Sequence, residues 1–555
     1  MTTLLTGLNR RILGRELLAG VTLLAIAVPL NIGYAQIAGL PAAAGLAALV
    51  VPTLVWALAT SSRQLVASPD AAAAALVASS LGGLAVAGSE HYAIMALAQA
   101  VICGVLFAVM AVCKLGFLAN FLSKPILIGF VAGLALDILA SQVAKMLGVR
   151  LESGLDFGAK ALGLLAGLGG TNPWSALIAA GGVGILLLGK RVAPVVPWAL
   201  VVMVLATVVA VLTNAAAAGV AVLGAVPGGF PALTWPTLGW QDWLALVPSA
   251  LALTMVTAAE GLLVSRSYGE QRGYVTRPNR DLLAFGMANV AAGASGSFVL
   301  GASTSRTAAM DQAGSRTQLP SLVLAAGTLL LLLFGTGLLA EIPSPAIGAI
   351  VGVAVLPLLG VSGFRGLWRV SRAEFWIGLV CFAVTLCIGA LAGILVAFVL
   401  ALINLARRAA HPAIDVLGES GDPSTSALEG APPATRSEHG PLVIRMAAPL
   451  FFANGAVFVQ AVREAVAEAG GPKTVRHLVI DLEGVTDVDV TGAEAFAGLR
   501  AWLREADISL SFSRLRRAAR PRLNRFGVVR TGDPVYATNR AAMTALAPTP
   551  ERNES

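Results

Sequence analysis

The sequence predicts a polytopic α-helical membrane protein that carries a small α/β domain at its C-terminal end. Of its 555 residues, 57% are hydrophobic and only 12% are charged, whereas a soluble protein has about 25% charged residues. The mean hydropathy of +0.81 also places most of the chain in a lipid bilayer. Near the C-terminus the charged fraction rises, and short apolar runs alternate with segments of helical periodicity, which is typical of an α/β domain.

Long uncharged runs divide the first part of the chain into fourteen predicted membrane segments. A spanning helix needs about 20 mostly apolar residues, and a run such as Tyr92–Cys113 meets this length. Leu17–Ser62 suffices for two spans separated by a turn at Gly39–Pro41, and Phe375–Ala406 suits a hairpin bent near Gly389–Gly393. The fourteen segments are predicted to begin near positions 16, 41, 70, 92, 117, 172, 194, 244, 279, 304, 317, 343, 374 and 392.

Basic residues lie unequally on the two sides of these segments. With the N-terminus inside, 18 Lys and Arg residues fall in inner loops, and only Lys145, Arg150 and Lys160 fall in outer loops. Because cytoplasmic loops carry the excess of Lys and Arg, both termini are predicted to be cytoplasmic and the chain integral to the plasma (inner) membrane. The net charge of +8 therefore reflects membrane topology, and we expect no nucleic-acid partner.

The predicted domains are a transmembrane domain over 1–408, a Pro- and Ser-rich linker over 409–440, a cytoplasmic α/β domain over 441–546 and a tail over 547–555. Within the α/β domain, Leu442–Arg445 and His477–Leu482 are predicted strands. Ala456–Ala469 and Ala493–Glu505 are predicted helices, because their apolar residues recur with a helical period.

Two segments open with Pro and hydroxyl residues in place of an aliphatic run. The breaks Ser68–Ala71 and Ser303–Arg306 lie 235 positions apart, at corresponding places in a weak internal repeat. Paired interruptions of this kind indicate a transporter's binding site at the bilayer midplane. If each break starts a half-helix, its unpaired N–H groups attract an anion, and Arg306 adds a full positive charge. The alternative is that both breaks are ordinary helix caps at kinks.

Charged residues within spans are costly and therefore need explanations. Asp70 is either an ion-pair partner of Arg306 or a group that takes up a proton when an anion binds. Glu260 is a candidate for proton coupling because burial favours the neutral form of a carboxylate; the alternative is a structural ion pair with Arg306. Asp137 is interpreted as a hydrogen-bonding residue in helix packing. With no nucleophile–base set, phosphate loop or metal-ligand cluster in the sequence, we expect no enzyme activity, no metal and no cofactor.

Several motifs resemble those of the SulP (sulfate permease-like) anion transporters with a C-terminal STAS domain. The order of the motifs along the chain makes the resemblance specific. The motifs are Leu18-Ala19-Gly20-Val21-Thr22, Val28-Pro29, Tyr34-Ala35, Ala38-Gly39-Leu40-Pro41, Ser61-Ser62-Arg63-Gln64-Leu65, Ser68-Pro69-Asp70-Ala71, Ser303-Thr304-Ser305-Arg306-Thr307, Arg316-Thr317-Gln318-Leu319, Pro449-Leu450-Phe451-Phe452-Ala453-Asn454 and Asp487-Val488-Asp489-Val490-Thr491-Gly492.

The resemblance implies that the fourteen segments form two inverted seven-segment repeats, arranged as a core domain and a gate domain. It further implies a homodimer, elevator-type motion and an anion site between the N-termini of segments three and ten, with Glu260 in a coupling role. The implied substrate-binding residues are Tyr34, Asp70, Ala71, Ser303, Thr304, Ser305 and Arg306.

Three residues depart from the family pattern. Leu30 replaces a common Gln, which removes one polar contact. Val264 replaces the Thr of sodium-coupled members, so we expect protons rather than sodium. Val490 replaces a common Ser and leaves Thr491 as the hydroxyl of the STAS loop, so its phosphorylation stays open.

The resulting hypothesis is a secondary active transporter of a small anion. Sulfate is favoured, with bicarbonate or a dicarboxylate left open, and the coupling ion is expected to be a proton. Two alternatives from other classes stay open: an uncoupled anion channel, and an anion sensor that signals through the STAS domain.

Overall fold

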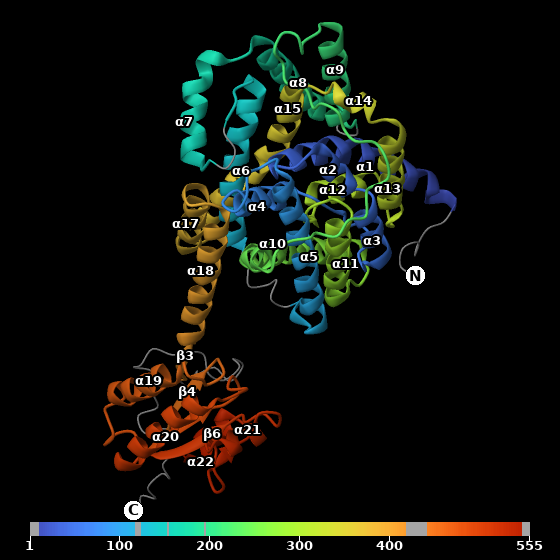
Figure 1. Ribbon diagram of the computed structural model, residues 1–555. Helices are drawn as coiled ribbons and strands as arrows, with labels where there is room; N and C mark the ends of the chain where they lie inside the picture. The colour runs from blue at the N-terminus through green and yellow to red at the C-terminus, as the bar shows by residue number, and fades with distance from the viewer. Residues whose placement is uncertain (1–9, 117–123, 152–154, 194–195, 418–440, 547–555) are drawn as a thin grey trace, which may run out of the picture. The chain divides into compact units, whose positions relative to one another are not determined.

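The computed structural model describes residues 10–116, 124–151, 155–193, 196–417 and 441–546, which form two compact units, Met1–Ala401 and Leu402–Ser555 (Figure 1). The predicted start of segment five at 117, most of the predicted linker and the predicted tail lie outside the described residues. The first unit is helical apart from two very short strands, and the second is an α/β domain.

The helices of the first unit follow one another with short connections. They are α1 (Arg10–Ile37), α2 (Ala42–Ala47), α3 (Val51–Ala59), α4 (Ala71–Leu81), α5 (Glu90–Val112), α6 (Lys124–Leu147), α7 (Phe157–Gly167), η2 (Leu168–Gly170), α8 (Pro173–Val192), α9 (Trp198–Leu212), α10 (Trp240–Arg272), α11 (Pro278–Ala294), α12 (Thr304–Gln312), α13 (Leu319–Phe334), α14 (Gly337–Ala340), α15 (Ser344–Val355), η3 (Leu356–Leu359), α16 (Val361–Val370), α17 (Arg372–Cys387) and α18 (Ala390–Ala410), which continues into the second unit.

The predicted segment boundaries agree closely with these helices. Outside segment five, a helix begins within about six residues of every predicted start. The predicted turns are present at Gly39 and Gly389, both in the positive-φ region that glycine adopts without strain. Among the described residues, six helices are long and apolar enough to cross a bilayer, or seven if the bent pair Phe157–Gly170 and Pro173–Gly189 is one span.

Some elements differ from the sequence prediction. The segment predicted to begin near 279 does not continue to the next one at 304, because α11 ends at Ala294 and extended chain follows. The prediction also missed α7 and α16. Asp137, interpreted as a packing residue, instead forms an ion pair with Lys160 of α7 at 2.8 Å. The omission of α7 explains this error, because without it no cation was expected within reach of Asp137.

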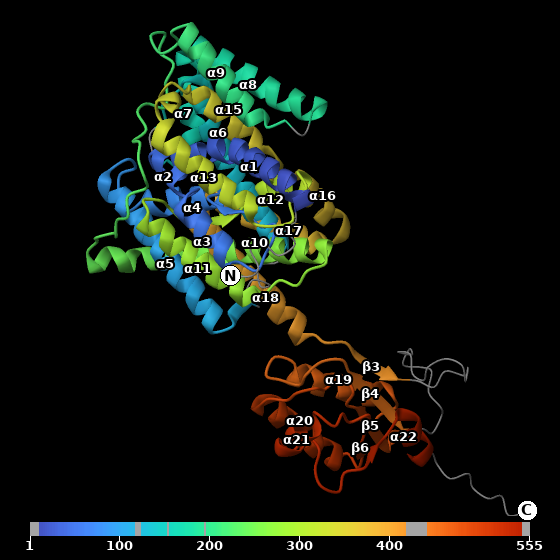
Figure 2. The same ribbon diagram turned by 90° about the vertical axis from the view of Figure 1, so that its right-hand side faces the viewer.

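Small residues allow α1 to lie against several helices at once (Figure 2). An added Cβ at Gly20 would lie 2.5 Å from Val323 of α13, and one at Gly33 would lie 2.2 Å from Val351 of α15. Such close backbone approach is the usual way in which membrane helices pack. It fixes α1, and with it Tyr34, against the helices around it.

The second unit contains a five-stranded sheet in the order β3-β4-β5-β6-β7. Its strands are β3 (Ile414–Leu417), β4 (Leu442–Met446), β5 (His477–Asp481), β6 (Ser509–Ser513) and β7 (Val535–Tyr536), and its helices are α19 (Gly455–Glu468), α20 (Val490–Glu505), α21 (Arg520–Arg525) and α22 (Asn539–Leu546). The predicted strands and helices are present. The antiparallel edge strand β3 was missed, because it lies in the segment predicted as linker.

Candidate functional site

The two predicted breaks meet in the interior of the helical unit. The strands β1 (Ala67–Ser68) and β2 (Gly301–Ala302) pair antiparallel, with Ala67 opposite Ala302 and Ser68 opposite Gly301. The pairing continues one residue further, because the Ser303 amide donates to the Val66 carbonyl at 3.0 Å. Extended backbone inside an apolar unit needs partners for its N–H and C=O groups. Each break supplies them to the other.

A half-helix begins directly after each strand. Asp70 caps α4 by accepting a hydrogen bond from the Ala73 amide at 2.7 Å, and Ser303 caps α12 by accepting one from the Arg306 amide at 3.4 Å. Pro69 lies one residue before the cap. The first N–H groups of a helix have no partner within it. Both half-helices therefore present polar N-termini beside the β1–β2 pair.

Arg306 joins the two breaks from within the protein. Its side chain is almost completely buried, with 1% exposure. Nε donates to the Ser303 hydroxyl at 2.8 Å, Nη2 donates to the Pro69 carbonyl, and the guanidinium lies 5.6 Å from the centre of the Tyr34 ring. Nη1 is buried without a hydrogen-bond partner among the described residues. One positive charge is therefore held at the junction of α1, α4 and α12.

The two half-helix N-termini differ in what they expose. The Thr304 and Ser305 side chains in the first turn of α12 are exposed, whereas Ala71 in the first turn of α4 and Tyr34 are buried. The hydroxyl groups of Thr304 and Ser305 are accordingly the accessible polar groups of the junction. The structure thus brings together the whole predicted set: Tyr34, Asp70, Ala71, Ser303, Thr304, Ser305 and Arg306.

Two carboxylates flank the junction. The Asp70 carboxylate packs on Gly301, where an added Cβ would lie 2.6 Å from Oδ2. Glu260 of α10 is half-buried and lies within electrostatic range of Asp70. Among the described residues, Glu260 has no ion pair or hydrogen bond through its side chain, and neither of the predicted ion pairs with Arg306 is present.

Two residues without a predicted role hold the first break in place. The Gln318 amide donates to the carbonyls of Ser62 at 3.0 Å and Leu65 at 2.9 Å, and the Thr307 hydroxyl accepts from the Val66 amide at 3.0 Å. Gln318 and Thr307 both stand in motifs that carried the family resemblance. Their place in these motifs was the only sequence signal that they matter. The spacing of residues along the chain does not indicate that they bond to residues about 250 positions away.

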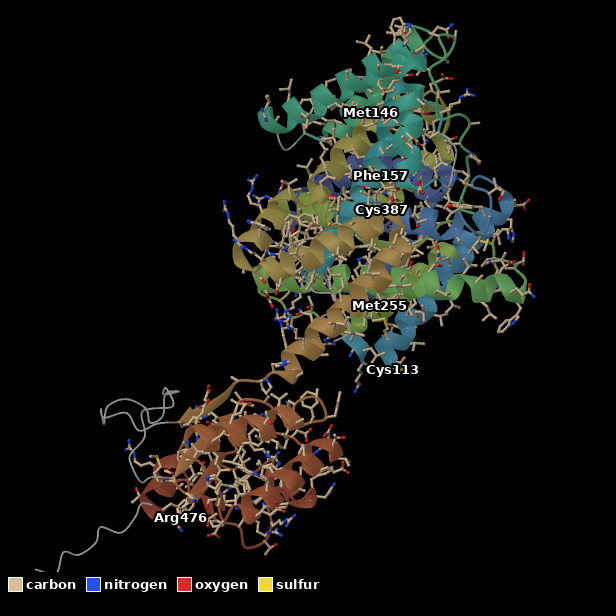
Figure 3. All side chains as sticks on the ribbon, turned by 90° about the vertical axis from the view of Figure 1, so that its left-hand side faces the viewer. Cys113, Met146, Phe157, Met255, Cys387 and Arg476 are labelled. Atoms are coloured by element: carbon tan, nitrogen blue, oxygen red, sulfur yellow. The ribbon has the colours of Figure 1, made fainter. Side chains whose placement is uncertain are left out.

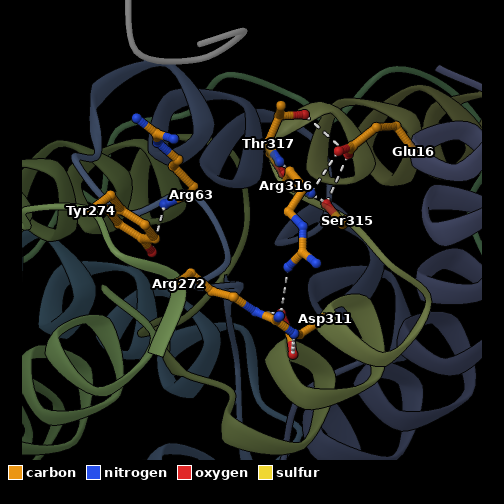
Figure 4. Close-up of polar contacts among 8 residues, drawn as sticks. All are labelled: Glu16, Arg63, Arg272, Tyr274, Asp311, Ser315, Arg316 and Thr317. Carbon is orange, nitrogen blue, oxygen red and sulfur yellow. Dashed lines mark hydrogen bonds and ion pairs between the residues drawn. The ribbon is translucent and has the colours of Figure 1, made fainter. Parts of the chain in front are cut away.

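A polar cluster also anchors the ends of α1, α10 and α12 (Figure 4). The buried Glu16 carboxylate accepts hydrogen bonds from the Ser315 hydroxyl, the Arg316 amide and the Thr317 hydroxyl, at 2.6–3.0 Å. Asp311, at the end of α12, pairs with Arg272, the last residue of α10. These contacts fix the far end of α12 and therefore the direction of its N-terminus.

Known proteins share both the sequence and the fold. Residues 13–381 match the sulfate permease family, and residues 432–542 match the STAS domain. A protein of Mycobacterium tuberculosis named a probable sulfate transporter is 34% identical over 516 residues, which cover 93% of this chain and 91% of that protein. The chloroplastic sulfate transporter 4.1 of Arabidopsis thaliana is 26% identical over 539 residues, covering 93% and 77%.

Solved structures show the same architecture. The chain superimposes on SLC26A9 with a TM-score of 0.88 at 21% identity, covering 98% of this chain and 91% of that one. The transmembrane domain of the cyanobacterial bicarbonate transporter BicA gives a TM-score of 0.58 at 23% identity, covering 71% and 98%. The chain is therefore an integral membrane protein of the sulfate permease family of anion transporters, carries a C-terminal STAS domain, and is not an enzyme.

Proposed function

We propose that the protein is a secondary active transporter that holds a small anion between the N-termini of α4 and α12, the third and tenth segments of the sequence analysis. The observation that carries this proposal is the β1–β2 junction, because it places two half-helix N-termini and the Arg306 charge together inside the helical unit. Helix N-termini and an arginine in a low-dielectric region stabilise a negative charge.

The anion contacts are assigned to the accessible edge of this junction. Thr304 and Ser305 donate hydrogen bonds through their hydroxyls and first-turn amides, and Ala71 contributes its backbone. Arg306, Tyr34 and Ser303 form the wall behind the anion, since all three are buried. Asp70 keeps α4 capped. Sulfate is the preferred substrate because relatives at 34% identity are named probable sulfate transporters; bicarbonate and dicarboxylates are the competitors to test.

Glu260 is proposed to carry a coupled proton. It is half-buried, it has no cationic partner among the described residues, and it lies within electrostatic range of Asp70. A carboxylate in this setting gains a proton more readily when a second negative charge, such as the substrate anion, arrives nearby. Val264 stands one helical turn further along α10, and its side chain offers no oxygen to a sodium ion, so a proton is the proposed partner.

The proposed arrangement of segments, the transport movement and the orientation in the membrane rest on the predicted topology and on the family. Fourteen segments in two inverted repeats, arranged as core and gate domains, would carry the anion by elevator-type movement in a homodimer. Both termini would face the cytoplasm across the plasma (inner) membrane, consistent with the 18-to-3 distribution of basic residues between predicted inner and outer loops.

Uptake by the purified protein in proteoliposomes tests the proposal. Radiolabelled sulfate, bicarbonate and fumarate are supplied outside, with and without an inward proton gradient. Sulfate should accumulate above its external concentration only when the gradient is imposed. Glu260→Gln should remove the stimulation by the gradient and leave anion exchange intact, and Glu270→Gln, an exposed residue of the same helix, is the control.

Each other outcome has a definite meaning. If none of the three anions enters, the transporter proposal is wrong. Equal stimulation in wild type and Glu260→Gln would remove Glu260 from coupling. Unitary currents far above about 10³ charges per second, the upper range of ordinary turnover, would favour an uncoupled channel. Signalling that needs residues 411–555, with no anion movement, would favour a sensor.

A further inference from the structure

A cavity lies beside α4, away from the helix end that faces the β1–β2 junction. Its volume is about 460 Å³, and its wall comes from the end of α1, the second half of α4, α6, α7 and the α17–α18 turn. Phe157, at the start of α7, is part of this wall, and Figure 3 shows it between Met146 and Cys387. The wall includes Ala75 of α4, one helical turn beyond Ala71 of the proposed anion site.

Lys145 of α6 brings to this cavity a positive charge that has no ion-pair partner among the described residues. Its ammonium donates to the side-chain oxygen of Gln36 at 3.1 Å, a neutral acceptor. No carboxylate lies within 4.0 Å of it in the part of the chain that the structure describes. An ammonium has three donors, and a charge partly removed from water is stabilised by an opposite charge. The free donors of Lys145 therefore suit an anion.

The other charged residues of the cavity are already satisfied. Lys160 donates to both carboxylate oxygens of Asp137 at 2.8 Å, so this pair is neutral overall. Asp156 caps α7 by accepting from the Ala159 amide at 2.8 Å, and it is exposed. Uncharged polar groups are also available, since Ser79 is exposed in the wall and Gln142 is buried there.

We propose that this cavity is a second anion site, in which Lys145 holds a small oxyanion of the transported class one step before or after the central site. This proposal rests on the proposed transport function. Lys145 lies in the last turn of α6, at the end predicted to face outward, so the site would collect the anion from the outside. A single lysine acts as a point charge and would bind weakly enough to release the anion to α4 and α12.

Charge-selective labelling tests the site without relying on transport. Ser79→Cys is introduced into full-length protein in which the exposed Cys113 and Cys387 are replaced by Ser. A sulfonate-bearing and a trimethylammonium-bearing methanethiosulfonate are compared. The anionic reagent should react faster, and Lys145→Gln should lower the ratio of anionic to cationic rate about tenfold. Sulfate should slow the anionic reagent more than sodium gluconate at equal ionic strength, which controls for screening.

Transport kinetics provide a second test of the Lys145 site. Lys145→Gln should raise the external sulfate concentration for half-maximal uptake about fivefold, and Lys145→Arg should stay within about twofold of wild type because it keeps the charge. Arg150→Gln removes an exposed charge just beyond the end of α6 and is the matched control.

The outcomes separate the two proposals. Unchanged labelling selectivity and unchanged half-saturation in Lys145→Gln, measured on protein that elutes as a single species, would overturn the second site. Equal effects of Lys145→Gln and Arg150→Gln would also overturn it, since they would show only a general surface field. If wild-type protein moves no sulfate but labelling still depends on Lys145 and on sulfate, the cavity binds anions and only the transport proposal fails.

Discussion

The two broken segments share a geometry but differ in the charge that caps them. Before α4 the cap is a carboxylate, Asp70, and before α12 it is a neutral hydroxyl, Ser303. The carboxylate places a negative charge on the N-terminus of α4 and offsets part of its positive potential. The hydroxyl leaves the N-terminus of α12 positive, and the Arg306 guanidinium lies against it.

The difference indicates that the two half-helices have unequal roles. The α12 side carries the exposed hydroxyls and the arginine and would bind the anion. The α4 side carries a charge of the wrong sign for an anion, so it would contribute only the Ala71 backbone contact and would mainly hold the first break in shape.

Removing the Arg306 guanidinium should have the largest effect. Arg306→Ala loses the hydrogen bonds to Ser303 and to the Pro69 carbonyl and the only charge of the anion's wall. A charge-assisted contact between the guanidinium and the bound anion would contribute about 1.5–3 kcal/mol, so sulfate affinity should fall about 10- to 100-fold, measured by competition in a binding assay. Arg306→Lys keeps the charge and should recover part of the loss. Unchanged affinity in Arg306→Ala would show that the arginine has a structural role alone.

Gly301→Ala should disturb both breaks through one methyl group. The new Cβ would lie 2.6 Å from Asp70 Oδ2, so the carboxylate must shift, and the hydrogen bond that its Oδ1 accepts from the Ala73 amide should weaken. Full loss of a helix cap costs about 1 kcal/mol, so uptake should fall by up to about fivefold. Gly184→Ala, where an added Cβ meets no atom within 4 Å, should have no effect. Wild-type uptake by Gly301→Ala would show that the breaks are independent.

Hydroxyl removal at α12 should be specific to binding. Thr304→Val and Ser305→Ala each remove one proposed hydrogen bond worth about 1 kcal/mol, so each should raise the half-saturating sulfate concentration about fivefold with an unchanged maximal rate. Ser80→Ala is the control, since this α4 hydroxyl bonds Gln99 and is not assigned to the anion. An equal effect of Ser80→Ala would contradict the assignment of binding to α12.

Asp70→Asn should change sulfate affinity least, and it should strengthen binding where the other substitutions weaken it. Asparagine also caps helices, so α4 should stay in place while a like charge near the anion is removed. Sulfate should bind about two- to threefold more tightly in an equilibrium assay, because the Coulomb repulsion near a partly exposed site is modest. Weaker binding would mean that the Asp70 charge orients Arg306 or another group of the site.

The sequence alone determined the helical segments and the location of the two breaks. Segment starts follow from apolar length and turn chemistry, which are local properties, and the Ser68–Ala71 and Ser303–Arg306 breaks follow from residues that cap helices. The strand β3 escaped prediction because four residues at the edge of a sheet, Ile414–Leu417, carry too little pattern to distinguish them from a linker. The helix α7 was not predicted because it is short and half-exposed.

Only the tertiary structure decided which groups meet at the junction. The partners of Arg306 are a carbonyl 237 positions away and a hydroxyl three positions away, not the carboxylates that charge alone would favour. Composition and spacing describe each segment by itself, whereas hydrogen-bond geometry depends on how α1, α4, α10 and α12 pack together. The cavity at Lys145 could not be predicted for the same reason. Whether a lysine lacks an ion-pair partner depends on which residues the tertiary structure places around it.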